Sequence, residues 1–172
     1  IPDAMKTMKV AAYVFDGYWE DIGTIRAFYD AHMDLLAHVP KMNLFDADSP
    51  IYTHPRFLPG SVIDGARLTN VLLADGCKIR QAEIEDAVIG LRSQVDDNVR
   101  ICKAILMGAD YYETIAQIEE DAQLGLPIMG VGEGSVIENA ILDKNVRIGR
   151  NVVIRNHEGC EDEETDTYVV RD

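Results

Sequence analysis

Large apolar residues recur at steps of five or six through the middle of the chain. They are Ile63, Leu68, Leu73, Ile79, Ile84, Ile89, Val95 and Ile101, and, after an interruption, Val131, Ile137, Leu142, Ile148 and Ile154. A second series of smaller residues keeps this step at Ala66, Val71, Cys77, Ala82, Ala87, Ser93, Val99 and Ala104, then at Ser135, Ala140, Val146 and Val152. A helix would space its apolar residues three and four apart, and a half-buried strand would alternate. The pattern instead predicts a parallel β-helix, in which each short strand contributes one large inward residue and each turn a small one.

Turn-forming residues lie where this β-helix needs its corners. Asp75-Gly76 and the Asp-, Gly- and Asn-rich segments 96–98, 132–134, 143–145 and 149–151 each precede a position of the smaller series. Such residues favour tight turns because Gly, Asn and Asp tolerate the left-handed backbone region. The inward residues by themselves indicate a solenoid core and no chemistry.

Residues 107–130 break the period. They carry a segment rich in Glu and Gln, roughly residues 115–124, which predicts one short helix. We expect an insertion expelled from the coil. Insertions in solenoids often form binding or assembly surfaces, although the acidic residues 119–121 also fit a solvated charge run.

The two ends differ in kind from the middle. The apolar run 8–15 predicts a buried strand, and Thr24 can cap a helix from Ile25 to about Leu36, with Ile25, Phe28, Tyr29, His32 or Met33, and Leu36 on one face. One strand and one helix cannot enclose a core, so we expect this segment to pair with a sheet outside the sequence. Residues 168–170 predict another strand at the far end, where we expect the chain to be cut as well.

Charge and cysteine content narrow the classes of function. The formal net charge is −14, the sequence pI is about 4.5 and 47% of residues are hydrophobic. This composition supports a folded core, and it argues against nucleic acid and membrane partners because both are polyanionic surfaces. The three cysteines, Cys77, Cys102 and Cys160, show no CxxC spacing, so we expect neither a disulfide framework nor a Cys-based zinc site. A reducing compartment fits this cysteine content best.

Five ordered blocks are specific enough to indicate a family: YWEDIGT at 18–24, IYTHPRFLP at 51–59, VIGLRS at 88–93, MGADYYE at 107–113 and ILDKNVRIG at 141–149. With them, the chain closely resembles, essentially end to end, the C-terminal part of glucose-1-phosphate adenylyltransferases. The resemblance implies a mainly β fold, a left-handed parallel β-helix preceded by a strand-helix remnant. The implied organisation is the end of a nucleotidyltransferase domain (1–38), an extended connector (39–60) and a regulatory and oligomerisation β-helix (61–172) with an insertion at about 107–130.

The activity that this resemblance implies joins ATP and glucose 1-phosphate into ADP-glucose and pyrophosphate, for glycogen or starch synthesis. The family is usually tetrameric, uses Mg²⁺ and responds to a phosphorylated metabolite, so a homo-oligomer and such an effector are expected partners. The Gly-rich, Arg-containing loop that holds the nucleotide in the family has no match in these 172 residues. We therefore expect the chain to be inactive alone. The expected location is the cytoplasm, or the plastid if the protein comes from a plant.

Two groups of site residues carry over from the family. Asp21 matches an aspartate that helps hold Mg²⁺ against the phosphates, and Trp19 would line the sugar side of the same pocket. The structural alternatives are a carboxylate stabilised by a helix N-terminus and an aromatic ring buried against that helix. His54, Arg56 and Lys144 match positions near the phosphates of the effector, where Arg offers a two-pronged donor and Lys a point charge. The alternative for these residues is an ordinary solvated surface.

Two other functions remain as rivals, a stand-alone assembly module and an acyltransferase-like β-helix protein. The acyltransferase needs a general-base histidine on the coil. The four histidines, His32, His38, His54 and His157, all lie before or after the periodic segments. This position disfavours the acyltransferase, and the assembly module remains open.

Overall fold

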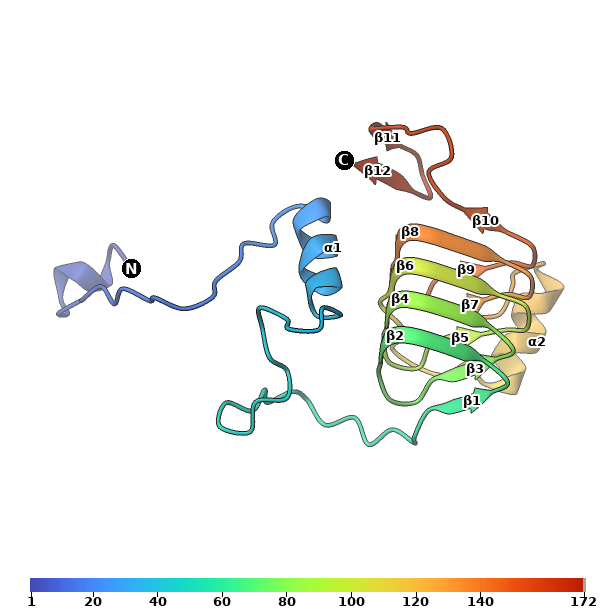
Figure 1. Cartoon of the computed structure of the whole chain (residues 1–172), viewed down its shortest axis with the longest axis horizontal. Helices are drawn as coiled ribbons and strands as arrows, with labels where there is room; N and C mark the ends of the chain where they lie inside the picture. Colours follow the sequence, from blue (N-terminus) through green and yellow to red (C-terminus); the bar gives the residue numbers. More distant parts are fainter. Residues whose placement is uncertain (172) are drawn as a thin grey trace.

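The computed structural model describes residues 1–171, and its main body is a coil of parallel strands (Figure 1). One face of the coil is a five-stranded sheet in the order β1-β3-β5-β7-β9, and the other is a five-stranded sheet in the order β10-β8-β6-β4-β2. The first sheet contains β1 (Val62–Asp64), β3 (Lys78–Arg80), β5 (Gln94–Val95), β7 (Gly130–Val131) and β9 (Arg147–Ile148). The second contains β2 (Arg67–Leu73), β4 (Glu83–Ile89), β6 (Arg100–Leu106), β8 (Val136–Leu142) and β10 (Val153–Ile154).

The register places each inward residue directly above its counterpart in the preceding turn. Leu68 pairs with Ile84, Ile84 with Ile101, and Ile101 with Ile137. Ile79, Ile84 and Ile89 are completely buried, and the predicted small positions Ala87, Val99 and Ala104 are buried in the same cluster. The predicted β-helix is therefore confirmed. Ile63 differs, since 43% of its surface is exposed. It belongs to β1, the outermost strand of its sheet, so no further turn covers it from that side.

The helix that precedes the coil lies on the outer face of the longer-stranded sheet. This helix, α1 (Ile25–Asp34), begins where predicted because the Thr24 side chain accepts a 3.1 Å hydrogen bond from the Ala27 amide, and it ends slightly before Leu36. It contacts β4 and β6, and Figure 1 shows it standing beside the coil. Val88 and Ile105 lie outside the inward cluster of the coil yet are buried, and they belong to the two strands that α1 contacts.

The strand predicted at residues 8–15 does not form in this structure, and its expected pairing with a sheet outside the sequence stays a prediction. The segment has no strand pairing, and Tyr13, Val14 and Phe15 are 87%, 87% and 60% exposed. A strand needs a neighbour for its backbone hydrogen bonds, and no other strand among residues 1–171 pairs with it. The segment instead follows a short 3₁₀ turn, η1 (Ala4–Lys6), and leads in extended form to α1.

The insertion and the C-terminal segment lie outside the stacked turns of the coil. The insertion leaves after β6, forms α2 (Ile115–Gln123) and rejoins the coil at β7, which confirms the predicted helix. A capping box between Thr114 and Gln117 begins α2. After the coil, β11 (Asp162–Glu164) and β12 (Val169–Arg171) form an antiparallel hairpin. The predicted strand near 168–170 is β12, and its partner β11 was not predicted. No helix among residues 1–171 is long and apolar enough to cross a bilayer.

Candidate functional site

One corner of the coil gathers the polar residues that the sequence singled out. We call it the Lys144 corner, and it comprises the successive turns at residues 75–76, 91–92, 108–110 and 143–145. Backbone hydrogen bonds connect these turns: the amides of Arg92, Ala109 and Asn145 donate to the carbonyls of Asp75, Leu91 and Gly108 at 3.1, 2.8 and 3.0 Å. This corner is also where the insertion begins, so the insertion and Lys144 are neighbours in space although distant in sequence.

Lys144 at this corner is held by Asp110. Its Nζ lies 2.8 Å from Asp110 Oδ1, and the Asn145 side chain donates to Asp110 Oδ2 at 3.0 Å. The Asn145 side chain also accepts a 2.9 Å hydrogen bond from the Asp110 amide, so it is hydrogen-bonded to both the backbone and the side chain of Asp110. Asn145 can do so because its backbone is left-handed, with φ of 59°. The hydrogen bond from Lys144, followed by that from Asn145, lowers the pKa of the Asp110 carboxyl below its ordinary value of 3.8.

Arg92 is a second cation at this corner, one turn below Ala109. Its backbone is left-handed with φ of 58°, a conformation that costs a side chain such as Arg more than Gly or Asn. Its guanidinium donates to the Ala109 carbonyl at 3.1 Å and lies 5.7 Å from the centre of the Tyr112 ring. Arg92 is not among the site residues predicted from the sequence. The available signal was a large cation at a turn position where neighbouring turns use Gly76 and Asn145.

His54 and Arg56 lie in the connector, and both are exposed. The Arg56 guanidinium donates to the His54 carbonyl at 3.1 Å. Leu58 lies beside Gly76, so the connector reaches the lowest turn of the Lys144 corner. Lys144 lies three turns higher, or about 14 Å along the axis at the usual strand spacing. The structure thus brings the connector, at Leu58, to the edge of the coil that carries Lys144, but three turns below it.

Asp21 and Trp19 lie in the extended segment before α1. Trp19 is 74% exposed, so it is not packed against the helix. Asp21 precedes the N-cap Thr24 by three residues, and the first turn of α1 contains no acidic residue, so Asp21 is not a helix-terminal carboxylate. Within residues 1–171, no group of three or more His, Cys, Asp or Glu side chains could hold a metal ion. One carboxylate does fit Mg²⁺ as a single ligand, because this ion is commonly held by one or two carboxylates together with substrate phosphates.

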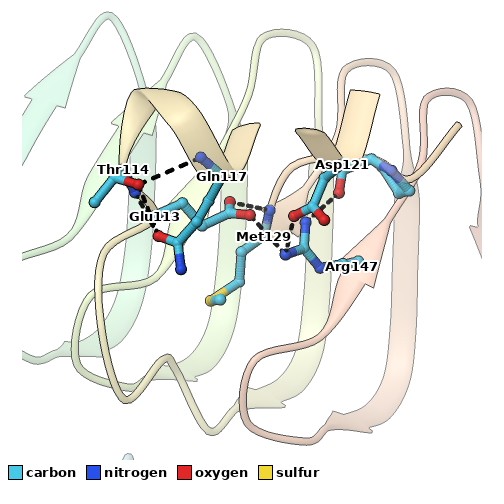
Figure 2. A network of polar contacts seen from close by, with 7 residues as sticks. Glu113, Thr114, Gln117, Asp121, Met129 and Arg147 are labelled. Carbon is cyan, nitrogen blue, oxygen red and sulfur yellow. Dashed lines mark hydrogen bonds and ion pairs between the residues drawn. The ribbon is translucent and has the colours of Figure 1, made fainter. Parts of the chain in front are cut away.

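A largely buried group of ion pairs, which was not predicted from the sequence, holds the insertion against the coil. Figure 2 shows Arg147 of β9 between two acidic residues of the insertion. Its guanidinium lies 2.6 Å from Glu113 Oε1 and 2.7 Å from Asp121 Oδ2. The Glu113 side chain is only 2% exposed, and it also accepts from the Met129 amide at 2.7 Å. Glu113, near the start of the insertion, is therefore bound both to Met129 near the end of the insertion and to Arg147 of the coil.

Comparison with known proteins agrees with this architecture. Residues 56–172 match the family model of the GLGC left-handed parallel β-helix domain, and residues 1–38 match that of the nucleotidyl transferases. The two matches define a nucleotidyltransferase segment joined to a left-handed β-helix. The first match covers most of the chain, which belongs to the glucose-1-phosphate adenylyltransferase family.

A relative supports this membership. The chain is 44% identical over 175 residues to a glucose-1-phosphate adenylyltransferase small subunit, chloroplastic/amyloplastic, from Triticum aestivum. The alignment covers 99% of this chain and 37% of that protein. The chain thus spans little more than a third of the length of this relative.

Proposed function

We propose that this chain is the C-terminal regulatory and oligomerisation part of an enzyme that makes ADP-glucose and pyrophosphate from ATP and glucose 1-phosphate. Family membership and the match of residues 1–38 to nucleotidyl transferases support the reaction class. The Gly-rich nucleotide loop of the family has no counterpart in the sequence. The chain purified alone should therefore form no ADP-glucose, and turnover that survives repurification would contradict this.

The regulatory part of the proposal rests on one observation, the Lys144 corner. Lys144, Asn145 and Arg92 surround a carboxylate at a solvent-exposed edge of the coil. Groups that hold a carboxylate with charge-assisted hydrogen bonds can also hold a phosphate or carboxylate of a small metabolite. We assign the effector site to this edge, with Lys144 as the principal cation and with Arg56 and His54 contributing from the connector.

The segment before α1 has the second proposed role. Asp21 would supply one oxygen ligand to Mg²⁺, and Trp19 would line the sugar side of the pocket. When bound, Mg²⁺ neutralises charge on the phosphates during nucleotidyl transfer. Both side chains are exposed in the extended segment, which leaves them accessible to groups supplied by the remainder of a catalytic domain.

Assembly and location follow from the family in the same way. We propose a homo-oligomer, a tetramer as in the family, built with the β-helix. For a plant source we propose the plastid, in keeping with the chloroplastic/amyloplastic name of the wheat relative, and otherwise the cytoplasm.

Steady-state kinetics of the full-length enzyme tests the regulatory assignment. Lys144→Ala or Arg56→Ala should raise the effector concentration for half-maximal response roughly tenfold or more, because a charge-assisted contact of about 1.5–3 kcal/mol is lost. Turnover without effector should change far less. Arg150→Ala is the matched control, since Arg150 is an exposed cation on a neighbouring turn whose ion pair is with Glu133. An unchanged effector response in both the Lys144 and the Arg56 variants would rule out the assignment.

A further inference from the structure

Asp110 occupies a place at the Lys144 corner that suits an anion from solution. Its two carboxylate oxygens are held separately, Oδ1 by Lys144 at 2.8 Å and Oδ2 by Asn145 at 3.0 Å. The positive charge of Arg92 acts on the same carboxylate. The corner is therefore already arranged to bind an anion, and the anion that it binds in this structure belongs to the chain itself.

This internal contact is open to exchange. The side chains of Lys144 and Asp110 are 49% and 53% exposed, so an ion in solution can reach both. An ion pair this exposed contributes little net free energy, because water and salt compete with it. A phosphate group offers more negative charge than one carboxylate and has several acceptor oxygens for the same donors.

We propose that Asp110 is a resident competitor of the effector: an anionic group of the effector takes the place of the Asp110 carboxylate on Lys144 and Asn145. The proposal rests on the effector site proposed above and adds to it a residue that sets the effector concentration required. Asp110 weakens effector binding, since its carboxylate must leave Lys144 first. Substitution of Lys144 and substitution of Asp110 should therefore shift the affinity in opposite directions.

The position of Asp110 gives this exchange a local structural consequence. Asp110 lies at the start of the insertion, three residues before the buried Glu113 that Arg147 holds. Lys144 and Arg147 thus bind two successive acidic residues of one segment from one turn of the coil. When the exposed contact at Asp110 is lost, the buried contact at Glu113 remains, so the change is confined to the few residues between Gly108 and Glu113.

Calorimetric titration of the full-length enzyme with inorganic phosphate, at ionic strength kept constant with chloride, tests the proposal. Asp110→Asn preserves the shape of the side chain and removes its charge, so it should tighten the Lys144-dependent phosphate binding roughly three- to tenfold. Glu119→Gln is the matched control, because it removes one charge from an exposed residue of the same insertion. It should change the affinity less than about twofold, since screening by salt weakens distant surface charges.

Two further variants separate the possible outcomes. Lys144→Gln should weaken phosphate binding, and in this background Asp110→Asn should have no further effect. If Lys144→Gln leaves binding unchanged, the effector site itself is wrong. If Lys144→Gln weakens binding but Asp110→Asn weakens it too or leaves it unchanged, the competitor role is overturned while the effector site stands. Tighter binding in the Asp110→Asn variant that persists with Lys144→Gln would also overturn it. Thermal melting by circular dichroism checks that every variant is folded.

Discussion

The Tyr29 hydroxyl of α1 donates a 2.8 Å hydrogen bond to the carbonyl of Lys103, a residue of β6 that lies 74 positions later in the chain. Lys103 has a left-handed backbone with φ of 49°, at the position that Asn70, Asp86 and Asn139 occupy in the other long strands. Its carbonyl is turned out of the strand pairing and is free to accept from α1. The contact joins the segment that carries Asp21 to the coil that carries Lys144.

Tyr29→Phe should loosen the docking of α1 without unfolding the coil. Removing one neutral hydrogen bond costs about 0.5–1.5 kcal/mol, which corresponds to roughly two- to tenfold faster opening. Hydrogen exchange of the α1 amides measures this directly. Tyr13→Phe is the control, because Tyr13 is 87% exposed and lies outside α1. Equal exchange in the Tyr29→Phe variant and the unmodified protein would mean that the hydroxyl does not hold the helix.

The stabilisation that the Tyr29 hydroxyl contributes should depend on pH. Burial, followed by the nearby charge of Asp30, raises the pKa of Tyr29 above its ordinary value of 10.0. A raised pKa means that the folded state holds the proton more tightly than the unfolded state, so this stabilisation is complete below pH 10.0 and is lost as pH rises through the folded pKa. In urea unfolding, the advantage of the unmodified protein over Tyr29→Phe should therefore persist to pH 10 and shrink above it. An advantage that shrinks at neutral pH would contradict this.

Ile84→Asp should unfold the coil. Ile84 is completely buried and contacts the inward residues of the turns on both sides, so a carboxylate there would be charged and unpaired in an apolar interior. The expected loss is several kcal/mol in the free energy of unfolding. Ile84→Val should cost only about 0.5–1.5 kcal/mol, and the outward neighbour Glu85→Ala less still. Denaturant unfolding followed by circular dichroism ranks the three variants, and a mild effect of Ile84→Asp would contradict the burial.

Arg147→Met should release the insertion from the coil. It leaves the buried Glu113 without a counter-charge, and breaking a buried pair in this way costs about 3–5 kcal/mol. The amide of Met129, which donates to Glu113, should then exchange much faster. Adding Glu113→Gln to Arg147→Met should restore part of the protection, because the fully buried unpaired charge is removed, whereas Asp121, the other partner of Arg147, is 23% exposed. A double variant no better than Arg147→Met would show that the charge imbalance is not the cause.

Asp21→Asn should lower kcat of the full-length enzyme and leave its effector dependence unchanged. A metal ligand acts on the transferring phosphates, and metal catalysis contributes several kcal/mol, so a loss of about tenfold or more is expected. Asp16→Asn is the control in the same extended segment, since Asp16 is also exposed. If kcat is unchanged, or if only the effector response moves, the assignment of Asp21 as a metal ligand is wrong.

The coil could be predicted from sequence because every turn needs apolar residues at the same inward positions. Ile79, Ile84 and Ile89 together fill one layer of the interior, each stacked on its counterpart in the turn before, and a period of five to six survives the interruption by the insertion. The strand predicted at residues 8–15 is not formed here, because an apolar run forms a strand only when a partner lies beside it, and the partner was expected outside the sequence. Apolar content alone could not supply that partner.

The polar contacts of the site were harder to predict. Lys144 and Asp110 are 34 positions apart, and Arg147 and Asp121 are 26 apart, and both aspartates belong to the insertion. Each pair depends on where the insertion rejoins the coil, and the period does not fix that point. Lys144 was recognised only through the resemblance to a family, whereas Asp110, Arg92 and Arg147 were recognised from the structure.

The insertion leaves the strand register intact. Val131 pairs with Val95 across the insertion just as Ile79 pairs with Ile63 where the coil is uninterrupted. Each layer of the solenoid depends on its immediate neighbours, so a corner can lengthen without disturbing the ladder beneath it. Chains of this architecture can therefore change the length and charge of this edge, and with it the proposed effector preference, while the buried interior stays the same.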